Sequence, residues 1–258
     1  MMPWHLLLAI WLVAAAMMTL GWAWQQRRAN AGIVDVLWST GLAVSAVANG
    51  ILGAGAVVPR IIVAGLGGAW GARLALHLWH RVRGEPEDGR YHALRARWGN
   101  NAFRWFGLFQ CQAFLIALFS IPFAAVATNP TASARWPALG IAIWLISVAG
   151  ESAADRQLAR FRADPTNRGR TCRTGLWRYS RHPNYFFEWL HWFSYVALAV
   201  GAPAAWYSLT GPLLMYVFLR WISGVPHTEA QALRTRGDEY RDYQRSTPVL
   251  IPWWPRTA

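Results

Sequence analysis

Residues 175–189 read GLWRYSRHPNYFFEW, and the rest of the chain is organised around this stretch. It places Arg181, His182 and Asn184 at the entrance to an apolar run, with Glu188 one helical turn further on. Pro183 suits the first turn of a helix, so the stretch predicts a helix that begins there. Polar side chains at this density near a membrane cost free energy unless they pair with each other, with water or with a ligand.

Two interpretations of this stretch remain open. In the first, the free N–H groups at the start of the helix and the nearby arginines hold a cofactor that carries phosphate. In the second, the stretch is an arginine-rich anchor at the membrane interface, and its aromatic side chains form an interfacial belt. Anchoring alone does not explain why Asn184 and Glu188 lie inside the next apolar run.

The composition is that of a membrane protein. Of the 258 residues, 55% are hydrophobic and 18 are Trp. Apolar runs of about 20 residues, the length that crosses a bilayer, recur along the chain. We therefore expect an all-α polytopic membrane protein that forms a single domain over residues 1–258.

The basic residues narrow the chemistry. The formal net charge is +13, and the sequence contains Arg but no Lys. This excludes a Schiff-base lysine and favours planar, bidentate recognition of phosphate or carboxylate. Nucleic-acid binding is a poor explanation of the charge, because membrane topology already accounts for where the arginines lie. Cys111 and Cys172 have no metal-type spacing, so we expect neither a metal site nor a disulfide.

Seven apolar runs predict seven membrane-spanning helices. Segments rich in arginine alternate with segments poor in arginine, and the positive-inside rule puts the rich ones in the cytoplasm. The N-terminus is then outside and the C-terminus is cytoplasmic. The first run is too long for a cleavable signal and lacks its basic start, so we expect it to be retained. The predicted spans are residues 4–24, 33–53, 61–80, 106–128, 137–155, 183–202 and 206–224.

Several ionisable residues fall within the predicted spans. Burying a charge in a membrane is costly, so each of them is a candidate for function. The alternative is a set of buried ion pairs, for example between Asp35 or Glu188 and an arginine, that only hold the helices in register. These residues are Asp35, Arg73, His77, Glu151, Asp155, Glu188, His191 and Arg220.

Two further patterns concern packing and charge. Gly and Ala residues in the second and third predicted spans indicate that these helices pack closely. The segment Arg156–Arg173 is expected to be a cationic loop. Such a loop suits the phosphates of a cofactor, through charge-assisted hydrogen bonds. Its alternative partner is the anionic headgroups of membrane lipids.

Four motifs, taken in order, resemble the bacterial branch of the steroid 5-alpha-reductase-like membrane reductase family. They are Glu87-Asp-Gly-Arg-Tyr91, Glu151-Ser-Ala-Ala-Asp155, Arg-His-Pro-Asn-Tyr at 181–185, and Tyr240-x-x-Tyr243 with the tail through Pro252. The resemblance implies a seven-helix bundle in the bacterial inner membrane that binds NADPH on the cytoplasmic side. It also implies reduction of a carbon–carbon double bond in a lipid-like enone. The C-terminal half is similar, in addition, to the isoprenylcysteine carboxyl methyltransferases.

The same resemblance implies roles for individual residues. Residues 150–252 would hold the cofactor, with Arg162 and Arg170 at its phosphates and Asn184 near the nicotinamide amide. The other residues that the resemblance places at the cofactor are Glu151, Asp155, Tyr179, Arg181, His182, Tyr185, Glu188, Arg220 and Glu229.

Asp35 falls roughly where the steroid reductases carry an acid that polarises the substrate carbonyl. Those reductases pair the acid with a tyrosine in the third span, where this sequence has Leu78. His77 or Tyr91 would supply the missing donor, and the sequence does not choose between them. Asp35, protonated because burial disfavours its charge, would act with this donor to stabilise the enolate that forms when hydride adds to the substrate.

Two other functions stay open. A methyltransferase that uses S-adenosylmethionine would place His182, Tyr185 and Glu229 at its cofactor, but that cofactor has no phosphate for the arginines to bind. A lipid-binding scaffold would leave Asn184, Glu188 and Asp35 without a role. We expect a monomer that contacts membrane lipid and takes a hydrophobic substrate from the bilayer.

Overall fold

The computed structural model describes residues 1–131 and 135–256, and every regular element in these two ranges is a helix. The all-α prediction is confirmed for this part of the chain. The helices form two compact units. Unit 1 comprises Met1–Pro137 and Tyr195–Gly211, and unit 2 comprises Ala138–Ser194 and Pro212–Ala258.

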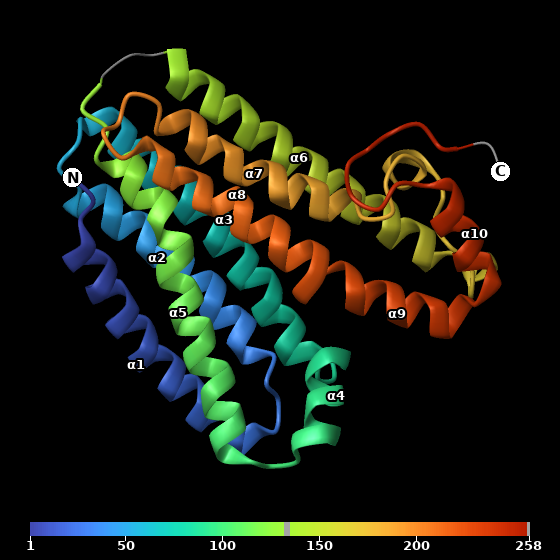
Figure 1. Cartoon of the computed structure of the whole chain (residues 1–258). Coiled ribbons are helices and arrows are strands. Elements are labelled where there is room, and N and C mark those ends of the chain that lie inside the picture. Colours follow the sequence, from blue (N-terminus) through green and yellow to red (C-terminus); the bar gives the residue numbers. More distant parts are fainter. Residues whose placement is uncertain (132–134, 257–258) are drawn as a thin grey trace. The chain divides into compact units, whose positions relative to one another are not determined.

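Unit 1 is a bundle of long apolar helices. In Figure 1, α1 (Trp4–Arg28), α2 (Ile33–Leu52), α3 (Val57–Gly84) and α5 (Ala102–Ala127) run side by side. The short helix α4 (Gly89–Trp98) connects α3 to α5, and the 3₁₀ helix η3 (Ala205–Leu209) packs against α5.

Capping residues set where the helices of unit 1 begin and end. The side chain of Asn101 accepts a hydrogen bond from the backbone N of Arg104 at 3.0 Å and caps the start of α5. Asp88 caps α4 in the same way. Ala29 has a left-handed conformation, with φ 50°, and ends α1 so that the chain turns into α2.

Small residues bring α2 and α3 together, as the Gly and Ala residues of these spans predicted. A Cβ atom added at Gly71 would lie 2.9 Å from both the backbone N of Ala43 and the carbonyl O of Ser39. A Cβ atom at Gly67 would lie 2.6 Å from that of Ala46. Such a close approach increases the van der Waals contact that holds helices together in a bilayer.

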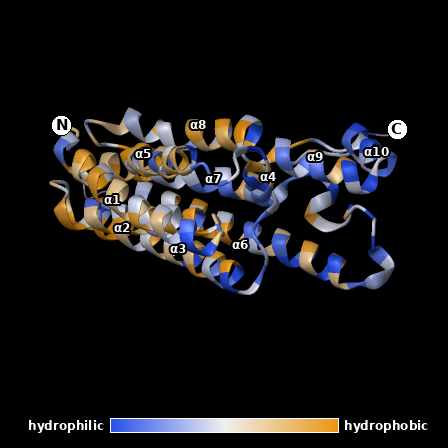
Figure 2. Cartoon of the chain, turned by 90° about the horizontal axis from the view of Figure 1, so that it is seen from below, coloured by the Kyte–Doolittle hydropathy of each residue, from blue (hydrophilic) through white to orange (hydrophobic). Residues whose placement is uncertain are grey.

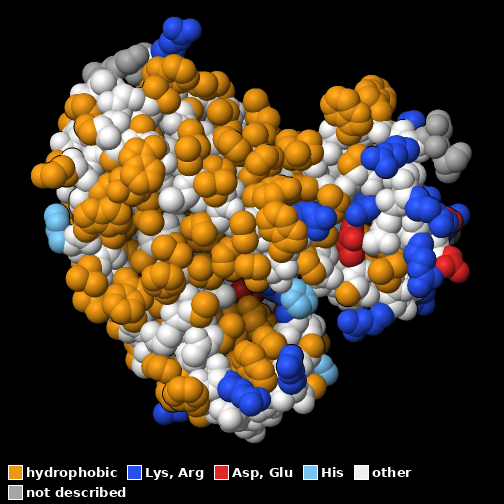
Figure 3. All heavy atoms as spheres, viewed as in Figure 1, with side chains coloured by type: hydrophobic (Ala, Val, Ile, Leu, Met, Phe, Trp, Pro, Cys, Tyr) orange, Lys and Arg blue, Asp and Glu red, His pale blue; other side chains and the backbone are white. Residues whose placement is uncertain are grey.

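Five helices in the described residues are long and apolar enough to cross a membrane. They are α1, α2, α3, α5 and α6 (Arg135–Ala163), and they overlap the first five predicted spans. In Figure 2 the hydrophobic colour follows α1 and α5, whereas α10 is mostly hydrophilic. Figure 3 shows hydrophobic side chains over the visible face of the unit 1 helices, as contact with lipid requires. The chain is therefore a membrane protein by its helix lengths and composition.

The sixth and seventh predicted spans coincide with shorter helices. Residues 183–202 contain α7 (Pro183–Leu198), which has 16 residues. Residues 206–224 contain most of η3, then α8 (Thr210–Val217) and the π-helix η4 (Phe218–Ile222). Neither is among the helices that meet the length for crossing a membrane, so the number seven and the orientation of the spans stay predictions.

Unit 2 holds the rest of the helices. Besides most of α6, and α7 as far as Ser194, it contains α9 (Val225–Arg236) and α10 (Asp238–Ser246). It also contains the short 3₁₀ helices η1 (Pro165–Asn167) and η2 (Gly175–Arg178). Gly237 joins α9 to α10 with φ 53°, a conformation that glycine adopts readily, and α10 folds back so that Tyr240 and Tyr243 pack on Ala232.

The prediction that Arg156–Arg173 is a loop was wrong in its first half. Helix α6 continues to Ala163, because no glycine or proline interrupts the chain between Asp155 and Ala163. The helix ends just before Pro165, which cannot continue it. The arginines as far as Arg162 therefore lie on a helix, and only those from Arg168 onward lie in irregular backbone or turns.

The α2–α3 contact predicts opposite effects of two matched substitutions on α3. Gly71→Ala puts a methyl group against the backbone of α2, and such overpacking costs about 1–3 kcal/mol. Gly65→Ala adds the same methyl group where no atom lies within 4 Å. The second change benefits from the helix propensity of alanine, worth roughly 1 kcal/mol. The apparent melting temperature of the purified protein in detergent should fall for Gly71→Ala and stay level or rise for Gly65→Ala; equal shifts would show that the contact is absent.

Candidate functional site

An acid and a phenol meet in unit 1, where α4 lies against the first turn of α2. The hydroxyl of Tyr91 donates to Oδ1 of Asp35 at 2.7 Å, and Nη2 of Arg90 lies 3.1 Å from Oδ2 of the same carboxyl group. The Tyr91 side chain is buried, while 26% of the Asp35 side chain remains exposed. We call these three residues the Asp35 cluster. Its partial exposure leaves the acid within reach of a ligand.

Asp88 holds Arg90 in place for this contact. Its Oδ1 accepts from the backbone N of Arg90 at 2.9 Å and from Nε at 3.1 Å, and its Oδ2 accepts from Nη2 of Arg81 at 2.8 Å. Burial would raise the pKa of Asp88, but the positive charge of Arg90 and its hydrogen bonds hold that pKa below its ordinary value. Asp88 therefore stays ionised and fixes the guanidinium that faces Asp35.

A second carboxylate ties the segment before α4 to the turn between α1 and α2. Oε1 of Glu87 accepts from the backbone N of Ala31 at 2.7 Å and from Nη2 of Arg95 at 2.8 Å. Nη2 of Arg95 also lies 3.3 Å from Oε1 of Gln25 on α1. These contacts fix the position of α4, and with it the position of Tyr91 over Asp35.

The protonation of Tyr91 follows from its surroundings. Burial, together with the negative charge of Asp35, raises the pKa of the phenol well above its ordinary value of 10.0. The hydroxyl thus keeps its proton at physiological pH, and it remains a hydrogen-bond donor.

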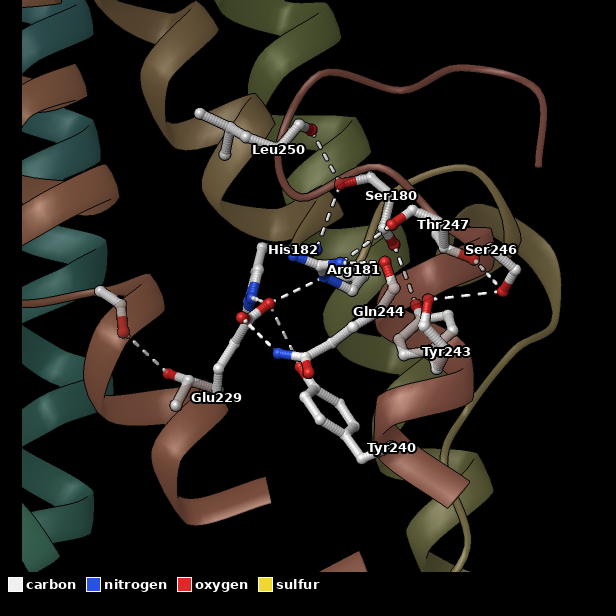
Figure 4. A network of polar contacts seen from close by, with 12 residues as sticks. Ser180, Arg181, His182, Glu229, Tyr240, Tyr243, Gln244, Ser246, Thr247 and Leu250 are labelled. Atoms are coloured by element: carbon white, nitrogen blue, oxygen red, sulfur yellow. Dashed lines mark hydrogen bonds and ion pairs between the residues drawn. The ribbon is translucent and has the colours of Figure 1, made fainter. Parts of the chain in front are cut away.

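The stretch at 175–189 is built around a different carboxylate in unit 2. Figure 4 shows Glu229 of α9 facing Arg181, His182 and Gln244. Its Oε1 lies 2.8 Å from Nε of Arg181 and 3.2 Å from Nε2 of His182, and its Oε2 accepts from Nε2 of Gln244 at 2.8 Å. The hydroxyl of Tyr240 is 3.5 Å away. We call this set the Glu229 network.

The network also binds the C-terminal tail. Nη1 of Arg181 donates to the carbonyl oxygens of Gln244 and Thr247 at 2.7 and 3.1 Å, and its backbone N donates to that of Pro248 at 2.9 Å. Ser180 donates to the carbonyl O of Leu250 at 2.7 Å. These bonds join the segment before α7 to α10 and to the residues that follow it (Figure 4).

Burial decides the charge states in this network. It lowers the pKa of His182 below the ordinary value of 6.5, although the hydrogen bond and the charge of Glu229 act in the opposite direction. Burial would raise the pKa of Glu229, but the hydrogen bond from His182 and the positive charge of Arg181 hold it below 4.5. A neutral imidazole thus meets a carboxylate, so Nε2 of His182 carries the proton and donates it.

The two groups of predicted site residues divide between the units. The predicted catalytic residues lie in unit 1, and the structure joins Asp35 to Tyr91. His77 is exposed on α3, and no hydrogen bond connects it to Asp35 within the described residues. All residues predicted to bind the cofactor lie in unit 2: Glu151, Asp155, Arg162, Arg170, Tyr179, Arg181, His182, Asn184, Tyr185, Glu188, Arg220 and Glu229.

Some of these unit 2 residues already contact one another. Nδ2 of Asn184 donates to Oδ1 of Asp155 at 3.2 Å. The ring of Tyr185 stacks on that of His182, with centroids 5.3 Å apart. Arg162 and Arg170 are exposed, and neither forms an ion pair among the described residues, so their guanidinium groups are available to an anion.

Sequence reasoning missed three residues of these clusters. Arg90 and Asp88 stand inside the Glu87–Tyr91 motif, and the pattern of an Asp that precedes a short helix indicates the cap that holds Arg90. Gln244 carries no such signal, because it reaches Glu229 only through the turn at Gly237.

Comparison with known proteins adds one match. A family model described as "Protein of unknown function (DUF1295)" matches residues 21–247, a range that includes both the Asp35 cluster and the Glu229 network. No curated protein and no solved structure matches the chain.

The buried neutral His182 predicts a loss of stability on mild acidification. Its folded-state pKa lies below 6.5, so the unfolded chain binds more protons than the folded chain as the pH falls through that value. The stabilisation is complete above about pH 6.5 and is lost progressively below it. The apparent melting temperature in detergent, followed from about pH 8 to about pH 5, should fall in this window.

Two histidine variants test the source of this pH dependence. His227 is exposed on α9, so His227→Gln should keep the wild-type profile. His182→Gln should lower the stability at neutral pH and flatten the profile near pH 6.5, since the titrating group is gone. Identical slopes in the two variants would assign the pH dependence to another group.

Proposed function

The chain belongs to the DUF1295 family, and we propose that it is a membrane reductase that uses NADPH to reduce the carbon–carbon double bond of a hydrophobic α,β-unsaturated carbonyl compound. In this proposal the chain resembles the steroid 5-alpha-reductases and lies in the bacterial inner membrane with seven spans. The cofactor-binding residues then face the cytoplasm, and the substrate enters from the bilayer.

The observation that carries the proposal is the 2.7 Å contact between the Tyr91 hydroxyl and Asp35. Reduction of an enone needs a donor at the carbonyl oxygen, where negative charge develops as hydride adds to the β-carbon. A phenol that keeps its proton supplies this donor when its single O–H turns from Asp35 to the carbonyl oxygen, and the contact with Asp35 holds the phenol at the site until then. In this proposal Tyr91 takes the role of the tyrosine that the steroid reductases carry at the position of Leu78.

The residues of unit 2 fit a dinucleotide. Arg162 and Arg170 are exposed cations without carboxylate partners in the described residues, as the phosphates of NADPH require. Asn184, fixed by Asp155, offers an amide for the nicotinamide carboxamide. The cofactor, when bound, supplies the hydride. The protein contributes its orientation and the donor at the carbonyl oxygen.

The methyltransferase alternative places Glu229 at S-adenosylmethionine, as the resemblance to the reductases places it at NADPH. Both oxygens of this carboxylate already accept hydrogen bonds within the protein, from Arg181, His182 and Gln244. A ligand would have to break the contacts that hold the C-terminal tail. This observation applies equally to both cofactors. The exposed Arg162 and Arg170 favour the reductase, because NADPH has phosphates for them to bind and S-adenosylmethionine has none.

Ligand-dependent stability distinguishes the two cofactors. A ligand that binds only the folded protein raises the free energy of unfolding by about 2.7 kcal/mol at a hundred times its Kd. NADPH should raise the apparent melting temperature of the purified protein, and S-adenosylmethionine should not. Double replacement of Arg162 and Arg170 by Ala should remove most of the NADPH shift, whereas Arg27→Ala, on α1, should leave it unchanged. A shift with S-adenosylmethionine alone would overturn the reductase proposal.

The Asp35 cluster predicts a separation of turnover from cofactor binding. Tyr91→Phe removes the donor and should lower turnover of an enone by roughly 10²–10³-fold, the usual effect of losing one donor to a developing oxyanion. Asp35→Ala should abolish turnover. Both variants should keep the NADPH shift in melting temperature. The rate is followed as loss of the NADPH absorbance.

The matched control is Tyr207→Phe, which removes a phenol hydroxyl elsewhere in unit 1. Tyr207 packs on Trp4 and Trp206 and lies outside the Asp35 cluster. The Tyr207→Phe variant should reduce the enone at the wild-type rate. Wild-type turnover in Tyr91→Phe would exclude the phenol from the reaction.

A further inference from the structure

A hollow of about 440 Å³ opens on unit 2 beside the C-terminal tail. Its size is within the range of sites that bind small molecules. It includes none of the residues assigned to NADPH above. Its lining consists of Arg173, Thr174, Gly175, Arg178, Ser246, Thr247 and Pro255.

The lining of this hollow is cationic. Two of its residues are arginines, and none carries a carboxylate. Arg173 is partly neutralised, since its Nη2 lies 3.8 Å from Oε1 of Glu239. Arg178 is exposed and forms no ion pair within the described residues; its guanidinium contacts only the ring of Tyr179, at 6.0 Å. One full positive charge therefore remains for an anion.

Among the described residues, two hydroxyl groups in the lining have only distant hydrogen-bond partners. Oγ1 of Thr174 lies 3.9 Å from Sγ of Cys172, and Oγ1 of Thr247 lies 3.5 Å from Oγ of Ser246. Both distances exceed those of strong hydrogen bonds. These hydroxyls are free to donate to an oxyanion beside the arginines.

Backbone hydrogen bonds hold the walls of the hollow together. The backbone N of Trp253 donates to the carbonyl O of Tyr179 at 3.0 Å, and that of Arg256 donates to Ser246 at 2.8 Å. The hydroxyl of Tyr243 donates to the carbonyl O of Ser180 at 3.2 Å and also to that of Trp177. These bonds hold the backbone of residues 177–180 against α10 and the tail, so a ligand that binds between them orders little additional backbone, which reduces the entropy lost on binding.

We propose that this hollow binds a phosphate group, with Arg178 as its principal cation and Arg173, Thr174 and Thr247 as further donors. Planar guanidinium groups and hydroxyls are the donor set that suits the three oxygens of a phosphate ester. The phosphate belongs either to a membrane lipid or to a soluble phosphate ester. Trp253 and Trp254 are 70% and 69% exposed beside the hollow, as aromatic residues at a membrane interface are, and they make the lipid a source to test.

The test is calorimetric titration of the full-length protein in an uncharged detergent. The probes are pyrophosphate, dihexanoyl phosphatidic acid and dihexanoylglycerol; the last two differ only in the phosphate. At least one phosphate probe should bind, and dihexanoylglycerol should not. Arg178→Ala should weaken that binding roughly tenfold or more, which is the effect of losing a charge-assisted hydrogen-bond pair.

The control is Arg234→Ala. Arg234 is exposed on α9, outside the hollow, and forms no ion pair in the described part of the chain, so its loss changes the net charge equally. The Arg234→Ala variant should bind the phosphate probe as tightly as the wild type does. The Arg178→Lys variant should retain part of the wild-type affinity for that probe. Binding of pyrophosphate identifies a soluble ester as the source, and binding of phosphatidic acid alone identifies a lipid. The proposal is overturned if neither probe binds, or if Arg178→Ala binds as tightly as Arg234→Ala.

Discussion

The carboxylate of Glu229 is largely withdrawn from water, with 14% of its side chain exposed, and the Arg181 guanidinium 2.8 Å away is 11% exposed. A charge in such a position is tolerated only when donors replace the lost water, and removing one partner of a buried pair costs about 3–5 kcal/mol. Arg181 meets this requirement while also binding two carbonyl oxygens, that of Gln244 in the last turn of α10 and that of Thr247 just after it. One ion pair thus determines the course of the chain before α7, the position of α9 and the attachment of the tail.

The same constraint acts in unit 1 with a different result. Asp35 is met by the Tyr91 hydroxyl and by Arg90, but about a quarter of its side chain stays exposed. Protein donors occupy both oxygens of each carboxylate, but 14% of the Glu229 side chain is exposed, against 26% of the Asp35 side chain. The Asp35 cluster is thus the more accessible of the two, and its phenol retains a proton. Because of this difference in accessibility, we assign a chemical role to the Asp35 cluster and a structural role to the Glu229 network.

The contacts within unit 2 show what the Arg-His-Pro-Asn motif at residues 181–184 does in the structure. Arg181 and His182 bind Glu229, Pro183 begins α7, and Asn184 reaches Asp155 on α6. The motif thus joins three helices and the tail of unit 2. The motif therefore accounts for the architecture of unit 2, and the proposed function takes its reaction from the Asp35 cluster instead.

The helices of this protein follow from local properties of the sequence. Apolar runs with few breakers place the first five long helices, Pro183 marks the start of α7, and small residues allow α2 to approach α3, because helix formation and membrane burial depend on neighbouring residues. The end of α6 differs from the prediction of a loop, because the arginines after Asp155 continue the helix and only Pro165 stops it. The sequence predicts two alternative donors, His77 and Tyr91. The contacts of Glu87 with Ala31 and Arg95 fix the position of α4, and this places Tyr91 against Asp35, which is 56 residues away in the sequence. Gln244 met Glu229 only after Gly237 reversed the chain. Contacts of this kind depend on how separate elements pack, which no local pattern encodes.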